Sequence, residues 1–212
     1  MNLKIRYNSP VVLTFALLSM AVYFINWLFW GDPMPGSSSL TSQFFTLRGV
    51  FNWSNPIDYL RMVSYPLGHA NKAHIVGNMS IFLLIAPIME EKYGSKNILL
   101  MMLFTAVLTG VFQIILFDSG LLGASGIVFM FIVLVSFADA QKGSIPLTFI
   151  LVVIFFVGKE VLSGFENNQV SEYAHIAGGF FGGLFGFMFK ENRMLSIAYT
   201  NFSISNSYSM FC

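Results

Sequence analysis

A serine between glycines is the residue of this sequence whose surroundings best suit covalent chemistry. Ser125 lies within Gly123-Ala124-Ser125-Gly126, at the beginning of an apolar run over 127–135. Its small neighbours leave the hydroxyl accessible, and the glycines permit a tight turn and the close approach of another backbone. The simpler alternative is that Ser125 only caps a helix N-terminus. The rest of the chain decides between these interpretations.

Two other apolar segments carry polar side chains that would complete such chemistry. His74 and Asn78 are four residues apart, so they share one face of a predicted helix. His175 begins another predicted helix, and a stripe of small residues along that helix lets a neighbouring helix pack closely. The stripe comprises Ala174, Gly178, Gly182 and Gly186. Tight helix packing explains the stripe by itself, so the question is what close packing achieves beside a histidine.

Helical rise places these residues at one depth. Measured to the charged end of its segment, the predicted helix rises about 21 Å from Ser125, about 22 Å from His175 and about 24 Å from His74. Each rise is shorter than a membrane core of about 30 Å. The serine, both histidines and Asn78 thus share a layer below the outer surface, where polar groups are costly unless they face one another or a cavity. A single histidine in a span commonly only packs, but three helices with such residues at one level make coincidence a poor explanation.

Acyl transfer is the chemistry that uses these residue types together. A serine hydroxyl becomes a good nucleophile when a base removes its proton, and imidazole, with a pKa of about 6.5, suits that task at neutral pH. An amide side chain, a second imidazole and a helix N-terminal N–H suit the developing oxyanion. Asp118 and Glu172 lie in predicted loops, and Asp139 lies at the opposite face. Because no carboxylate is placed to orient a histidine, we predict a Ser–His dyad rather than a triad.

The composition is that of an integral membrane protein. Of 212 residues, 56% are hydrophobic and 10% are charged, with 24 Phe and a mean hydropathy of +0.71. A soluble domain carries roughly a quarter charged residues. A net charge of +1 argues against a nucleic-acid partner. The single cysteine, Cys212, excludes an intramolecular disulfide and a cysteine-based metal site, and we expect neither metal nor cofactor.

We predict an all-α membrane protein with six spans. They cover about 11–30, 74–89, 98–117, 125–138, 145–162 and 173–189. With the N-terminus in the cytosol, seven Lys and Arg residues fall on the cytosolic side and four outside, in accord with the positive-inside rule. Both termini, 1–10 and 191–212, are then cytosolic and flank a membrane domain over 11–190. Aromatic residues recur through the external loop at 31–73, so we expect it to lie in the membrane interface.

At these residues the sequence resembles the rhomboid family of intramembrane serine proteases. The matching pieces are Gly123-Ala124-Ser125-Gly126, His74-x-x-x-Asn78 and Ala174-His175-x-x-Gly178-x-x-x-Gly182, in the family's order and on its helices. The resemblance covers about residues 10–190 and implies a six-helix rhomboid bundle with a long interfacial first loop. Each motif alone is weak, but together they are highly specific.

The resemblance implies a role for each matching residue. Ser125 would be the nucleophile and His175 its base. His74, Asn78 and the backbone amide of Ser125 would form the oxyanion hole. The glycines at 123 and 126 would support the serine.

Further positions match the family or depart from it. His69 matches a structural histidine and Gln113 a polar group near the active-site water, although either residue could serve structure alone. Many relatives have a Trp-Arg pair where this chain has Leu60-Arg61, which puts the anchoring of the first loop in doubt. Many have a tyrosine where this chain has Phe129, whose ring can still pack against the catalytic histidine.

The implied activity is cleavage of transmembrane proteins near the outer face of a bilayer, with the bacterial inner membrane as the expected location. The partners would be those substrates and the lipid bilayer, and substrates would enter beside the fifth segment, past Phe149, Phe155 or Phe156. One alternative is a catalytically inactive rhomboid-like protein that binds membrane clients, but such a binder needs no nucleophile and base. Another alternative is a transporter or channel. Such proteins commonly show inverted repeats or charges within their spans, whereas no predicted span of this sequence has a central Lys, Arg, Asp or Glu.

The predicted topology can be tested at the single cysteine. In intact cells a membrane-impermeant maleimide should leave Cys212 unlabelled, because the C-terminus is expected in the cytosol, and should label it after permeabilisation. A control chain with Ser54→Cys in a Cys212→Ser background should be labelled in intact cells, since Ser54 lies in the predicted external loop. Labelling of Cys212 in intact cells would overturn the assignment.

Overall fold

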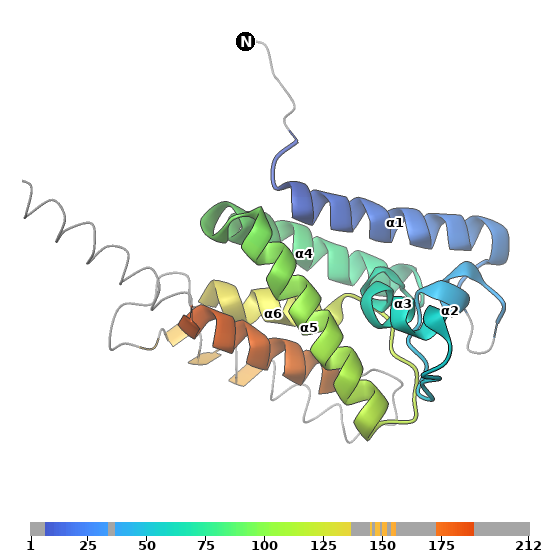
Figure 1. The fold of residues 1–212 in the computed structure, drawn as a ribbon. Coiled ribbons are helices and arrows are strands. Elements are labelled where there is room, and N and C mark those ends of the chain that lie inside the picture. Colours follow the sequence, from blue (N-terminus) through green and yellow to red (C-terminus); the bar gives the residue numbers. More distant parts are fainter. Residues whose placement is uncertain are drawn as a thin grey trace, which may run out of the picture.

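The computed structural model describes residues 7–33, 37–136, 145, 147–148, 150–151, 154–155 and 173–188, and its elements are helical (Figure 1). These are α1 (Pro10–Trp30), α2 (Leu40–Phe44), α3 (Pro56–Ser64), the 3-10 turn η1 (Tyr65–Leu67), α4 (Lys72–Tyr93), α5 (Ser95–Leu116) and α6 (Ser125–Ser136). Residues 173–188 form a further helix. The all-helical class is therefore confirmed for the described part of the chain.

Within the described ranges, three helices are long and apolar enough to cross a membrane: α1, α4 and α5, with 21, 22 and 22 residues. They correspond to the first three predicted spans. The described part of α6 is a shorter apolar helix, and six crossings stay a prediction. The predicted cytosolic tail, residues 137–138 of the fourth segment, Phe149 and Phe156 lie outside the described residues. Phe155 is described, and 71% of its surface is exposed.

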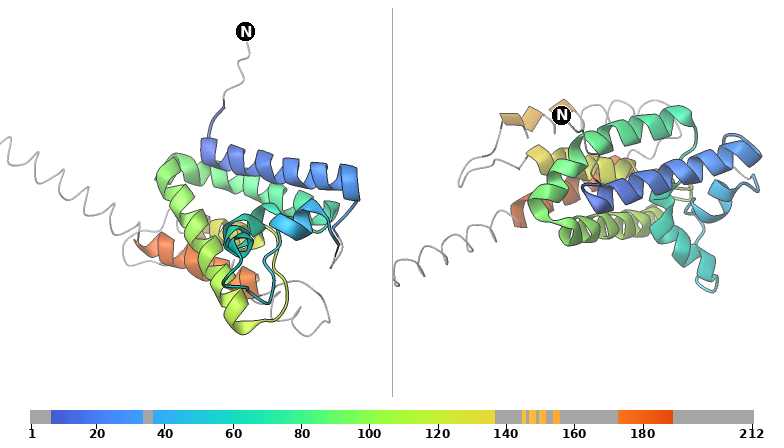
Figure 2. Two further views of the ribbon diagram at one scale, coloured as in Figure 1. Left: turned by 45° about the vertical axis from the view of Figure 1, so that its right-hand side comes forward. Right: turned by 90° about the horizontal axis from the view of Figure 1, so that it is seen from above.

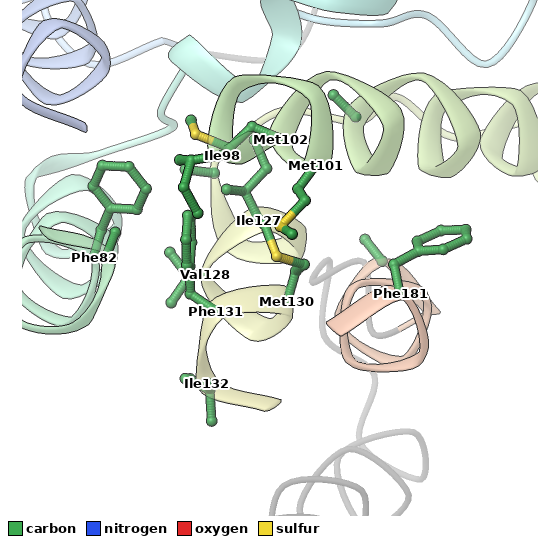
Figure 3. Close-up of a cluster of buried hydrophobic side chains, with 14 of the residues drawn as sticks. Phe82, Ile98, Met101, Met102, Ile127, Val128, Met130, Phe131, Ile132 and Phe181 are labelled. Atoms are coloured by element: carbon green, nitrogen blue, oxygen red, sulfur yellow. The ribbon is translucent and has the colours of Figure 1, made fainter. Parts of the chain in front are cut away.

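The helix that begins with Ser125 lies at the centre of the bundle. Nine of the 12 residues of α6 are buried, as expected for a helix that is apolar on all sides. Its side chains pack with Phe82 of α4 and with Met101 of α5 and its neighbours (Figure 3). Phe181 of helix 173–188 belongs to the same core, and its ring meets that of Phe104 of α5. Further views show α1 beside α4 on one side of this core (Figure 2). The central position means that residues on α6 can face several elements at once.

Helix 173–188 packs against α6 through glycines. A Cβ atom added at Gly178 would lie 1.9 Å from the carbonyl oxygen of Gly126, and one at Gly182 would lie 2.3 Å from that of Met130. No side chain fits at either position, so the two backbones are in direct contact. The small-residue stripe that the sequence indicated therefore serves the contact with α6.

At the other end of the bundle, a buried carboxylate joins three helices. Glu90 of α4 is 3% exposed and accepts hydrogen bonds from the backbone N–H groups of Val11 and Val12, at 3.1 and 2.9 Å. It also accepts one from the hydroxyl of Ser95, at 2.6 Å. The free N–H groups and positive dipole end of α1 stabilise its charge. Glu90 thereby ties the beginning of α1 to α4 and α5.

The first loop is folded rather than irregular. Its helix α3 buries Asp58, Arg61 and Ser64 and exposes apolar side chains such as Leu60. The guanidinium of Arg61 pairs with Asp58 and donates to the carbonyl of Gln43, at 2.7 Å. Arg61 therefore anchors the loop although leucine, not tryptophan, precedes it. An apolar outer face is what a helix in a membrane interface needs, and that location stays a prediction.

The glycine contact between the helices predicts unequal effects of two neighbouring substitutions. Gly178→Ala should lower the stability by about 1–3 kcal/mol, because its Cβ would overlap a backbone that cannot move aside. Gly179→Ala is the matched control, since its Cβ would meet only a methyl group of Val133, at 3.5 Å. Thermal unfolding in detergent micelles measures both. Equal melting temperatures for the two variants would contradict the contact.

Candidate active site

Ser125 is the first residue of α6, and the preceding residue occupies the capping position. The carbonyl of Ala124 accepts the first helical hydrogen bond, from the N–H of Val128 at 2.9 Å. Gly123 before it has φ +113°, a conformation that side chains rarely adopt. This sharp turn brings the chain into the helix and leaves Ser125 half-buried at its first turn. Ser125 is therefore not the N-cap that the simpler interpretation proposed.

The loop before Ser125 is held by backbone hydrogen bonds to the first loop. Leu121 and Leu47 exchange N–H···O bonds of 2.8 and 2.9 Å as an isolated antiparallel bridge. The N–H of Gly123 donates to the carbonyl of Tyr65, at 3.0 Å. These bonds fix the backbone of residues 121–123, which leads into the turn. Ser125 thus has a rigid support although it follows a loop.

His175 lies beside the first turns of α6. Its ring stacks on that of Phe129 with the centroids 4.3 Å apart and an interplanar angle of 1°. Phe129 is one helical turn beyond Ser125 and on the same face. A Cβ at Gly126 would lie 3.1 Å from the carbonyl oxygen of Ala174, the residue before His175. The expected packing of Phe129 on this histidine is confirmed, and the serine and histidine come from directly adjacent segments.

His74 and Asn78 of α4 face the turn that precedes the serine. A Cβ at Gly123 would lie 2.7 Å from Nε2 of His74 and 3.8 Å from Nδ2 of Asn78. The Nδ1 atom of His74 accepts a hydrogen bond from the N–H of Ala70, at 3.4 Å. Because Nδ1 is the acceptor, the ring proton is on Nε2, the atom that lies against Gly123. His74 therefore presents a donor toward the turn.

Asn78 presents a second donor. Its side chain is 9% exposed, and within the described part of the chain its Nδ2 atom is buried without a hydrogen-bond partner. Leaving such a group unpaired costs about 1–3 kcal/mol. A buried donor kept free beside the serine's turn is suited to a group that arrives with a substrate.

His69 and Gln113 take supporting positions around this set. His69 is fully buried, donates from Nδ1 to the carbonyl of Leu67 at 3.3 Å, and meets the ring of His74 edge-on at 5.0 Å. Burial lowers the pKa of His69 to about 4, so the ring is neutral at physiological pH. Gln113 bonds to Ser119 and to Tyr173. The sequence had indicated Gln113 but neither of its partners, since their hydroxyls follow no recognisable motif.

The geometry thus unites Gly123, Ser125, Gly126 and Phe129 with His74, Asn78 and His175. The described residues contain no cluster of His, Cys, Asp and Glu suited to a metal ion. The catalytic role of each residue stays a prediction at this point.

Comparison with known proteins supplies the family. The sequence profile described as the Rhomboid domain matches residues 56–192, more than half of the chain. The chain belongs to the rhomboid family. It is also similar to the rhomboid protease GlpG of Haemophilus influenzae, with 24% identity over 140 residues, covering 65% of this chain and 73% of that protein. The family resemblance indicated by the sequence motifs is thereby confirmed. With its several membrane helices, this rhomboid is an integral, multi-pass membrane protein.

Proposed function

We propose that this rhomboid is an intramembrane serine endopeptidase. The observation that carries the proposal is the position of the His175 ring, stacked on Phe129 one turn from Ser125. A base at this place faces the same side of α6 as the serine hydroxyl. The relative from H. influenzae is called a protease, and the motifs that led to the resemblance are those of an active enzyme.

In the proposed reaction the Ser125 oxygen attacks the carbonyl carbon of the scissile peptide bond while His175 takes the hydroxyl proton. The carbonyl oxygen becomes an oxyanion. Collapse of this intermediate breaks the C–N bond, and His175 gives its proton to the departing amine. Water then attacks the acyl carbonyl carbon while His175 takes its proton. The ester C–O bond breaks, the acid leaves, and His175 returns the proton to the Ser125 oxygen.

His74 and Asn78 are the proposed oxyanion donors. The Nε2–H of His74 and the Nδ2 of Asn78, which has no hydrogen-bond partner among the described residues, both lie against Gly123, two residues before Ser125. The backbone N–H of Ser125, at the beginning of α6, is the third donor. Donors fixed in place before the charge develops stabilise the transition state more than the substrate.

The proposed substrates are transmembrane proteins, cut near the outer face of the bilayer. The serine's turn lies at the end of the bundle that the first loop covers, opposite to Glu90. In the predicted topology this is the outer end. Substrates that reach the site from the lipid would pass the fifth segment.

The primary test compares cleavage of a transmembrane substrate by the wild-type protein in liposomes with that by Ser125→Ala and His175→Ala. Wild type should cleave the substrate and react with a fluorophosphonate at Ser125. Both variants should fail in both assays while remaining folded, because one lacks the nucleophile and the other its base. A folded wild type that binds membrane clients without cutting them or reacting with the probe would instead be the inactive rhomboid-like binder.

A second prediction separates catalysis from packing at Asn78. Asn78→Ala should lower kcat by about 10²–10³, or roughly 3–4 kcal/mol, with little change in KM, because the oxyanion exists only in the transition state. The matched control is Ser80→Ala, which removes an exposed polar group from the same helix. Rates should be normalised to the active-site concentration. Near-normal kcat in a destabilised Asn78→Ala protein would assign this residue to packing alone.

A further inference from the structure

A buried amide near the end of α5 connects the segments that lead to the serine and to the histidine. Gln113 is fully buried. Its Nε2 donates to the carbonyl of Ser119 and, at 3.2 Å, to the Ser119 hydroxyl. Its Oε1 accepts a hydrogen bond from the hydroxyl of Tyr173. Ser119 belongs to the loop that enters α6, and Tyr173 stands two residues before His175.

The ring of Tyr173 is held on a second side as well. It stacks on Phe117, the residue that follows α5, with centroids 4.3 Å apart and an interplanar angle of 23°. Stacking positions the ring, whereas the hydroxyl fixes its direction toward Gln113. The two contacts are separable, because phenylalanine would keep the first and lose the second.

The helical geometry makes this contact relevant to His175. Residues two apart on an α-helix point about 200° apart around the axis. The two side chains therefore leave nearly opposite sides of helix 173–188, with Tyr173 directed to Gln113 and His175 stacked on Phe129 of α6. A bond that fixes the direction of one side chain fixes the rotation of the helix, and hence the direction of the other.

Other contacts of this helix set its distance from α6 and hold its later turns. Gly178 and Gly182 determine how closely the helix approaches α6, and the rings of Phe181 and Phe185 pack on Phe104 of α5, farther along the helix than His175. The hydrogen bond from Tyr173 to a fully buried amide adds a directional restraint in the first turn, beside the histidine.

We propose that Tyr173 is a positioning residue for His175 and acts through Gln113. The inference rests on the proposed proteolysis, in which His175 is the base. The Tyr173 hydroxyl takes no part in proton transfer. It holds the first turn of helix 173–188 so that the imidazole meets the Ser125 hydroxyl, and Gln113 aligns that turn with the loop that carries the serine.

The test is Tyr173→Phe, with Tyr59→Phe as the matched control. Tyr59 also donates its hydroxyl to a backbone carbonyl, that of Trp53 at 2.9 Å, but in the first loop away from the site. Tyr173→Phe should lower kcat and the rate of fluorophosphonate labelling about tenfold per folded molecule, with KM within about twofold of wild type. Tyr59→Phe should leave all three unchanged. Equal kcat in Tyr173→Phe and wild type would overturn the proposal.

A measurement that does not depend on enzyme activity, the carbethoxylation rate of His175, separates this proposal from the proposed function. Carbethoxylation of His175, followed by mass spectrometry with His69 and His74 as internal references, should become several-fold faster in Tyr173→Phe, since the ring is no longer held against Phe129. Failure of wild type to cleave or to label would refute proteolysis, while the carbethoxylation rates would still decide on positioning. An unchanged His175 rate would refute the positioning role whether or not the protein is active.

A second variant covers the case in which Tyr173→Phe does not fold. Gln113→Met keeps the volume of the side chain and removes the hydrogen bonds, so it should cause a similar loss. If both residues act through one bond, the double variant should be no slower than the slower single variant. If the double variant instead lost activity by the product of the two single losses, the two residues would act independently and a shared path would be contradicted.

Discussion

Direct contact between two helix backbones is the constraint on which the candidate site depends. Gly178 meets the carbonyl of Gly126 where any side chain would overlap it, and Gly182 repeats the contact one turn later at Met130. Larger side chains would move the helix axes apart toward the usual 8–10 Å or so. Ser125 lies immediately before the first of these contacts and His175 three residues before Gly178. The packing that joins the helices therefore also brings the segments that carry the hydroxyl and the imidazole side by side.

Within so apolar a bundle, the polar groups show which positions are structural. Glu90 and the Asp58–Arg61 pair are buried, and each is compensated by backbone N–H groups or by the opposite charge. Nδ2 of Asn78 has no such compensation in the described part of the chain. Some buried hydroxyl groups in the described part of the chain share that lack, among them that of Thr109, which lies 3.9 Å from where a Cβ of Gly126 would stand. A buried amide donor beside the serine's turn, without a partner among the described residues, suits a group that arrives with a substrate.

Much of this arrangement could be predicted from the sequence, because membrane helices leave a regular signal. Apolar runs gave the first three spans within a few residues, and helical rise alone placed Ser125, His74 and His175 in one layer. Spacing also predicted that Phe129 could pack on the histidine. The fold of the first loop was not predictable, since α3 buries Asp58 and Arg61 and turns apolar residues outward, against the usual pattern of a helix in water. Nor was the bond between Gln113 and Tyr173, because a contact over 60 residues between side chains leaves no periodic trace.

The support of the serine extends beyond the part of the chain that the family profile matches. That match begins at residue 56, whereas Leu47, nine residues earlier, pairs with Leu121 in the loop before Ser125. The pairing uses only N–H and C=O groups, so most residue types can form it and a sequence profile has little to detect. Glycine is required where the first loop approaches still more closely, since a Cβ at Gly49 would lie 2.0 Å from the carbonyl oxygen of Asp118. Main-chain contacts of this kind let the first loop hold the serine's turn in place without using its own side chains.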